Sequence, residues 1–234
     1  MSTQPRWPGV DAAREQLVDL HLSLVDNGLV AWTSGNVSAR ARDANGDEVL
    51  VIKPSGIDYA ALTARTMVVC DLHGTVLDGD LSPSSDTAAH AYVYRHRPDV
   101  GGVVHTHSPY ACAWAARHEP IPCVLSAMAD EFGGPIPVGP LTTIGDDSIG
   151  RGIVATLDGH RSPAVLMANH GVFTIGPDAR AAVKAAVMCE DVARSVHFAH
   201  QLGIPKPIPA DLVDRFYNRY QSSYGQHDQP APSG

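Results

Sequence analysis

An apolar run that ends in two histidines, Gly101-Gly102-Val103-Val104-His105-Thr106-His107, constrains this chain more than any other segment. An uninterrupted apolar run of this length predicts a strand buried on both faces of a sheet. Because side chains alternate along a strand, His105 and His107 should point to one side and Thr106 to the other. Two residues span about 6.6 Å of strand, and two imidazoles can converge across that distance on one cation. The alternative is a pair of surface or core histidines.

A second apolar run, at 164–168, leads into Asn169-His170-Gly171. It also places a histidine where a strand-like segment meets a glycine. Three neutral imidazoles at the ends of two buried strands would leave a fourth position open for water or substrate, as catalytic zinc requires. The sequence therefore predicts a metal site formed by His105, His107 and His170.

The composition limits what the protein can bind and where it works. A chain of 234 residues with 44% hydrophobic and 18% charged residues is typical of one globular domain. The net charge of −8 argues against a nucleic-acid partner, and no apolar run approaches the roughly 18 residues of a membrane span. The four cysteines form no CxxC pair, and the N-terminus lacks the apolar core of a signal peptide. We therefore expect a cytoplasmic protein without nucleic-acid or membrane partners.

Strand and helix patterns are intermixed along the chain, without an internal repeat. The Asn45-Gly46 pair between two strand-like segments predicts a hairpin, and the turn at 71–74 predicts a second one. We expect an α/β fold with a central, mostly antiparallel sheet flanked by helices. The single domain should span 11–226, between a flexible N-terminus at 1–10 and a disordered tail at 227–234. Helices are expected at 11–27, 88–97, 109–118, 149–157, 177–202 and 210–220, short strands at 121–125 and 136–138, and a loop at 129–134.

Three polar segments contain the parts of an anion site. Ser34-Gly35-Asn36 and Lys53-Pro54-Ser55-Gly56 offer backbone N–H groups, hydroxyls and one lysine charge. Ser82-Pro83-Ser84-Ser85-Asp86 opens a helix, whose first N–H groups can also bind an anion. Ordinary turns are the simpler interpretation of the first two segments. Asp86 is either a helix-capping carboxylate or a metal ligand or general base.

These motifs, in this order, resemble the class II aldolase family of sugar-phosphate aldolases and epimerases. The resemblance extends from Asp11 to Gln226, and five ordered motifs are more specific than any one of them. The matching pieces are Ser34-Gly35-Asn36-Val37-Ser38, Lys53-Pro54-Ser55-Gly56, Pro83-Ser84-Ser85-Asp86, His105-Thr106-His107 and Asn169-His170-Gly171.

The resemblance implies a cofactor and a substrate class. In that family three histidines hold zinc, which implies one Zn²⁺ per subunit, with Mn²⁺ as an alternative, on His105, His107 and His170. The acidic residue after the paired serines is implied at the metal as ligand or base, and here it is Asp86. The polar turns are implied to bind the phosphate of a phosphorylated ketose. The residues concerned are Gly35, Asn36, Lys53, Ser55, Gly56, Ser84 and Ser85.

The resemblance leaves the reaction open between two kinds of enzyme, both using retro-aldol and aldol chemistry through a metal-stabilised enediolate. Asp86 and the ending Tyr224-Gly225-Gln226 resemble L-ribulose-5-phosphate 4-epimerases, whose acid/base pair would correspond to Asp130 and Tyr224. The compact segment at 136–166 is instead similar to L-fuculose-1-phosphate aldolases. A non-enzymatic scaffold, as in the adducin head domain, is the third alternative, and the intact histidine triad argues against it.

The family also implies an assembly. Its members build the active site between the subunits of a cyclic homotetramer, so that Asp130 and Tyr224 would reach a neighbour's metal. The C-terminal segment carries Phe216, Tyr217 and Tyr220, which is more aromatic surface than a free tail needs.

Overall fold

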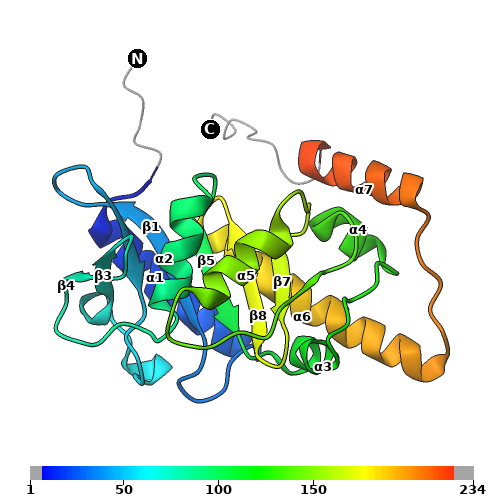
Figure 1. The fold of residues 1–234 in the computed structure, drawn as a ribbon, viewed down its shortest axis with the longest axis horizontal. Coiled ribbons are helices and arrows are strands. Elements are labelled where there is room, and N and C mark those ends of the chain that lie inside the picture. The colour runs from blue at the N-terminus through cyan, green and yellow to red at the C-terminus, as the bar shows by residue number, and fades with distance from the viewer. Residues whose placement is uncertain (1–6, 224–234) are drawn as a thin grey trace, which may run out of the picture.

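The computed structural model describes residues 7–223, which form a central sheet between two layers of helices (Figure 1). The strands are β1 Asn36–Arg42, β2 Glu48–Ile52, β3 Val68–Asp71, β4 Val76–Asp78, β5 Gly102–Thr106, β6 Val138–Gly139, β7 Ala164–Met167 and β8 Gly171–Gly176. The helices are α1 Val10–Asp26, α2 Thr87–His96, α3 Pro109–Arg117, α4 Ser126–Phe132, α5 Ser148–Leu157, α6 Ala179–Leu202 and α7 Ala210–Ser223. Among the described residues no helix is long and apolar enough to cross a membrane.

The eight strands follow the order β4-β3-β2-β1-β5-β8-β7-β6, and only the β6–β7 pair is parallel. This confirms the predicted fold class, an α/β fold with a mostly antiparallel sheet flanked by helices. The first hairpin, at Asn45-Gly46, joins β1 to β2, and the turn at 71–74 joins β3 to β4. Strand β5, which carries His105, lies near the middle of the sheet, between β1 and β8.

The side chains of β1 alternate between the two faces of the sheet, so that the strand has one apolar face and one polar face. Val37 and Ala39 join the core formed with α1 and α6 on one side of the sheet. Asn36 and Ser38 face the opposite layer, where they hydrogen-bond to residues of α2 and of the segment just before it. Asn36 is also the register partner of His105 on β5. The polar face of β1 therefore lies next to the histidine-bearing end of β5.

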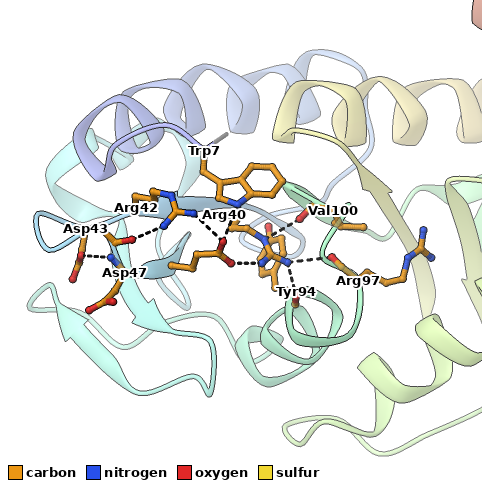
Figure 2. A network of polar contacts seen from close by, with 10 residues as sticks. Trp7, Arg40, Arg42, Asp43, Asp47, Tyr94, Arg97 and Val100 are labelled. Atoms are coloured by element: carbon orange, nitrogen blue, oxygen red, sulfur yellow. Dashed lines mark hydrogen bonds and ion pairs between the residues drawn. The ribbon is translucent and has the colours of Figure 1, made fainter. Parts of the chain in front are cut away.

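A buried arginine on this polar face fixes the far end of α2 (Figure 2). The guanidinium of Arg40 is 3% exposed and lies 2.6 Å from the carboxylate of Glu48. It also donates to the backbone carbonyls of Tyr94 and Arg97, which end α2, and its centre lies about 5 Å from the Tyr94 and Trp7 rings. Because the last carbonyls of a helix have no partner within it, Arg40 stabilises the end of α2 directly.

Two local predictions were wrong. The segment at 129–134, predicted as a loop, belongs largely to α4, because Met128 and Phe132 are spaced four apart and both are fully buried. The strand predicted at 121–125 contributes one bridge, between Ile121 and Ile136. Proline at 122 lacks the N–H group that a longer ladder would require.

Of the two predicted domain boundaries, the one between residues 10 and 11 lies within the described residues and the one between 226 and 227 does not. Of the predicted N-terminal segment at 1–10, the structure describes Trp7 to Val10. Trp7 is buried there, and α1 begins at Val10. The predicted tail at 227–234 lies outside residues 7–223.

Candidate metal centre and anion cavity

The three predicted histidines come together at one end of the sheet. His105 is on β5, His107 follows that strand by one residue, and His170 lies in the turn between β7 and β8. One ring nitrogen from each of the three lies within 4.8 Å of the other two, and Nε2 of His105 is 2.9 Å from Nε2 of His107. Zinc–nitrogen bonds of about 2.0–2.1 Å place tetrahedral ligand atoms roughly 3.3 Å apart, so the cluster fits such an ion.

The orientation and charge of His105 also suit a metal ligand. Its Nδ1 lies 3.0 Å from the carbonyl oxygen of Val172, which makes Nδ1 the donor and directs the Nε2 lone pair toward the other two histidines. Its ring stacks on that of Phe173, its register partner on β8. Burial, together with the neighbouring histidines His170 and His107, lowers the pKa of His105 to about 3, against the opposing effect of Asp86. His105 is therefore neutral at pH 7.

Glycine is required at position 171, beside the histidines. A Cβ atom built on Gly171 would lie 2.6 Å from the carbonyl oxygen of Thr106 and 3.1 and 3.2 Å from the rings of His105 and His107. Any larger residue would push the two rings away. The Asn169-His170-Gly171 motif thus supplies both one histidine of the cluster and the space that the other two histidines occupy.

Asp86 points into the site instead of capping its helix. Its carboxylate makes no capping hydrogen bond to α2 and accepts one from Nδ2 of Asn36, at 2.7 Å. Burial alone would raise the pKa of Asp86, but His105, His90 and the Asn36 amide together lower it below its usual range. The carboxylate is therefore ionised, as a ligand or a general base must be.

A cavity of about 320 Å³ connects the histidines to all three predicted polar turns. Its inner end is formed by buried groups, including His105 and Asp86, and its outer part by exposed residues such as Ser55 and Ser85. The Oδ1 atom of Asn36 is buried in this region without a hydrogen-bond partner among residues 7–223, so a polar ligand could satisfy it. Every predicted phosphate-binding residue lines the cavity: Gly35, Asn36, Lys53, Ser55, Gly56, Ser84 and Ser85.

Lys53 connects the turns that surround the cavity. Its side chain is 2% exposed, and its Nζ donates to the carbonyl oxygens of Thr33 and Pro54. Burial lowers the pKa of Lys53, although Asp58 opposes the shift. A buried ammonium group at the wall of the cavity provides positive charge in a site whose other walls are mostly neutral.

Two further histidines near the site have structural roles. His21 on α1 donates through Nδ1 to the carbonyl of Leu17 and accepts through Nε2 from the backbone N–H of Val37. His90 on α2 bonds Ser38 through Nδ1. Neither belongs to the three-histidine cluster.

Of the predicted acid/base pair, Asp130 is described by the structure and is not part of this cavity. Asp130 lies on α4, where its carboxylate is 3.5 Å from the guanidinium of Arg219 on α7, and it does not line the cavity. Tyr224 lies outside the described residues. Within one chain, the structure brings together the predicted metal and phosphate residues but not Asp130.

One exposed apolar residue of the cavity is not predicted from the sequence. Ile144, in the segment between β6 and α5, lines the cavity and is 62% exposed. No motif marks it, because an exposed isoleucine in a polar loop fits neither a helical nor a strand pattern.

The comparisons with known proteins agree with this architecture. The chain matches the family described as Class II Aldolase and Adducin N-terminal domain over residues 15–197. It belongs to this family, and within it to the aldolase and epimerase enzymes.

Its relatives cover nearly the whole chain. The chain is 36% identical over 228 residues to the L-ribulose-5-phosphate 4-epimerase UlaF of Salmonella paratyphi B, covering 91% of this chain and 98% of that protein. The solved structure of an L-fuculose 1-phosphate aldolase is 26% identical, with a TM-score of 0.83, and covers 93% of this chain and 100% of its own. YgbL of Klebsiella pneumoniae is 29% identical, with a TM-score of 0.76, covering 89% and 99%.

Proposed function

We propose that the protein is a zinc-dependent enzyme that performs retro-aldol and aldol chemistry on a phosphorylated ketose, most like an L-ribulose-5-phosphate 4-epimerase. The observation that best supports this proposal is the single cavity shared by the three histidines and the polar turns. The 36% identity to UlaF, over almost the full length of both proteins, favours the epimerase.

Each part of the cavity has its own task in this proposal. The turns at 34–36, 53–56 and 84–85 bind the phosphate through N–H groups and hydroxyls, which act locally and so suit a protein of net negative charge. A divalent ion on the histidines, Zn²⁺ or alternatively Mn²⁺, supplies Lewis-acid polarisation of the ketose carbonyl. Asp86, oriented by Asn36, serves as a further ligand or as the base beside the ion.

Epimerisation also needs a proton donor on each face of the aldehyde that carbon–carbon cleavage releases. We assign these roles to Asp130 and Tyr224. Because Asp130 does not line the cavity of its own chain, it would act in a neighbouring subunit's cavity. The active enzyme is then a homotetramer with sites shared between subunits.

A ketose-1-phosphate aldolase is the second candidate. Two observations favour it: the fold similarity to L-fuculose 1-phosphate aldolase, with a TM-score of 0.83, and the compact segment at 136–166. Such an enzyme would release dihydroxyacetone phosphate and an aldehyde without adding them back.

The two candidates differ in their products. Purified zinc-loaded protein would be incubated with L-ribulose 5-phosphate and, separately, with L-fuculose 1-phosphate, and the products resolved by NMR. Conversion of the first sugar to its 4-epimer supports the epimerase, and cleavage of the second to two fragments supports the aldolase. Turnover of neither substrate by metal-loaded protein would contradict both.

A further inference from the structure

Helix α3 contacts both of the turns that carry the less buried metal ligands, His107 and His170. His107 lies two residues before its first residue, Pro109. At the opposite end of the helix, the carbonyl of Ala115 accepts a hydrogen bond of 3.1 Å from the backbone N–H of Asn169, next to His170. Between these ends, the thiol of Cys112 lies 3.9 Å from the carbonyl oxygen of His170. A displacement of the N-terminus of α3, with its other end still held at Asn169, would therefore move His107 relative to His170.

The N-terminus of α3 lacks the cap that its sequence suggests. Ser108 stands at the N-cap position but makes no capping bond. Its hydroxyl is buried and lies 3.3 Å from the hydroxyl of Thr106. The first free N–H groups of the helix need another acceptor, because no helix can satisfy them internally.

That acceptor is a carboxylate from another helix. Glu190 on α6 accepts from the N–H of Tyr110 through Oε1 and from the N–H of Ala111 through Oε2, both at 2.9 Å. Two charge-assisted bonds at the positive end of the helix dipole hold α3 more firmly than a serine cap would. Because α6 packs on the central sheet, the carboxylate connects the start of α3 to the rigid core.

We propose that Glu190 is a positioning residue for the metal centre: by holding the N-terminus of α3, it fixes the separation of His107 and His170 and thereby sets metal affinity. The inference rests on the metal site proposed above. Glu190 is not itself a ligand, since it lies outside the three-histidine cluster and does not line the cavity.

The test measures metal binding directly. Zinc dissociation constants would be determined by competition with a chromophoric chelator for wild type, Glu190→Gln, Glu190→Met and Asp191→Asn, and visible spectra recorded with Co²⁺ in place of zinc. Gln keeps one acceptor and turns an N–H donor toward the other backbone N–H, whereas Met removes both acceptors. Asp191 is the matched control, because it is the next carboxylate on α6 and pairs at the surface with Arg194.

We expect Glu190→Met to raise the zinc Kd about ten- to hundredfold, the usual effect of losing a group that orients metal ligands. Glu190→Gln should give a smaller increase, with a shifted Co²⁺ spectrum in both variants. Asp191→Asn should bind as the wild type does. If the Met variant does not fold, the zinc Kd of the Gln variant alone tests the proposal.

Two results would overturn the inference while leaving the metal site intact. One is a folded Glu190 variant with a lower thermal midpoint of the metal-free protein but an unchanged zinc Kd, which would make the contact purely structural. The other is an equal loss of affinity in Asp191→Asn, which would indicate a general effect of charge. A wild-type protein that binds no metal would overturn the metal site itself, and this inference with it.

Discussion

The Nδ2 atom of Asn36 lies 2.7 Å from Oδ2 of Asp86 and 2.9 Å from Oγ of Ser84. One amide group thus joins the end of β1 to the residues that precede α2, and it connects the polar turns to the carboxylate beside the histidines. The pairing spans 50 residues of sequence. Asn36 therefore holds Asp86 in place as well as lining the cavity.

Replacing Asn36 by Ala should lower kcat about ten- to hundredfold, because Asp86 would lose the donor that orients its carboxylate. Steady-state kinetics with whichever of the two sugar phosphates the protein turns over would measure the effect. Asn45→Ala, in the exposed hairpin turn, is the matched control and should leave kcat unchanged. Equal kcat values for the Asn36 variant and the wild type would show that Asp86 needs no such partner.

Adding a negative charge at the cavity mouth should weaken substrate binding. Ser85→Glu is expected to raise KM about fivefold or more, because a carboxylate within a few ångströms of a phosphate costs at least about 1 kcal/mol. Ser85→Ala removes the hydroxyl without adding charge and should have a smaller effect. Competition by inorganic phosphate would be measured in parallel. If KM and phosphate inhibition are the same in both variants, the phosphate does not bind at Ser85.

Acid should destabilise the protein partly through His21. Burial, and to a smaller extent Lys53, lowers the pKa of His21 to about 3 from its usual 6.5, against the opposing effect of the Leu17 carbonyl. Between these values the unfolded chain binds a proton at His21 that the folded chain does not. The contribution of neutral His21 to the free energy of unfolding is therefore fully present above pH 6.5 and is lost as the pH decreases. The loss is about 1.4 kcal/mol per pH unit, or roughly 2 kcal/mol at pH 5.

His21→Gln should remove this part of the pH dependence. A glutamine amide can donate to Leu17 and accept from Val37 without titrating. Urea unfolding of the metal-free protein at pH 7 and pH 5 would compare wild type, His21→Gln and, as a control for the substitution itself, the exposed His73→Gln. The same loss of stability in wild type and His21→Gln would exclude His21 as its source.

Arg40 should matter more for stability than its neighbour Arg42, although both pair with Glu48. Arg40→Met would remove the shorter ion pair of Glu48 and leave the carbonyls of Val100, Tyr94 and Arg97 without their side-chain donor, and should cost about 3–5 kcal/mol of unfolding free energy. Arg42 is 36% exposed, and Arg42→Met should cost less than about 1 kcal/mol. Urea titrations of the two variants give the comparison, and equal losses would refute the buried role of Arg40.

A shared active site predicts complementation. Asp130→Asn and His105→Ala should each be inactive alone, the second without bound metal. After mixing and reassembly, about a quarter of the sites would combine an intact metal centre from one subunit with an intact Asp130 from another. Activity would be assayed alongside sedimentation of the mixture. No recovery from a fully mixed tetramer, or an active wild-type monomer, would contradict the shared site.

The sequence predicted those parts of the site that depend on local pattern. The convergence of His105 and His107 follows from strand alternation alone, and the hairpin at Asn45-Gly46 follows from turn chemistry. The pairing of Asn36 with Asp86 does not follow from local pattern, because the amide could bond to many partners until β1 and α2 pack together. The capping interpretation of Asp86 was equally reasonable from its position before a helix, and only tertiary contacts decide against it.

Other features carried no signal that sequence reasoning could use. The helix α4 was mistaken for a loop because Asp130, Glu131 and two following glycines concealed the spacing of Met128 and Phe132. Glu190 is one carboxylate among several on α6, and its contact with α3 arises only from the way the two helices pack.

The contact between His105 and the carbonyl of Val172 has a consequence for synthesis of the chain. A protein is made from its N-terminus, so the turns at 34–36, 53–56 and 84–85 emerge first. His105 obtains its acceptor, and His170 its place beside it, only after residue 172 has been added. A nascent chain that stops before that residue would contain every polar turn of the cavity but not the completed three-histidine cluster.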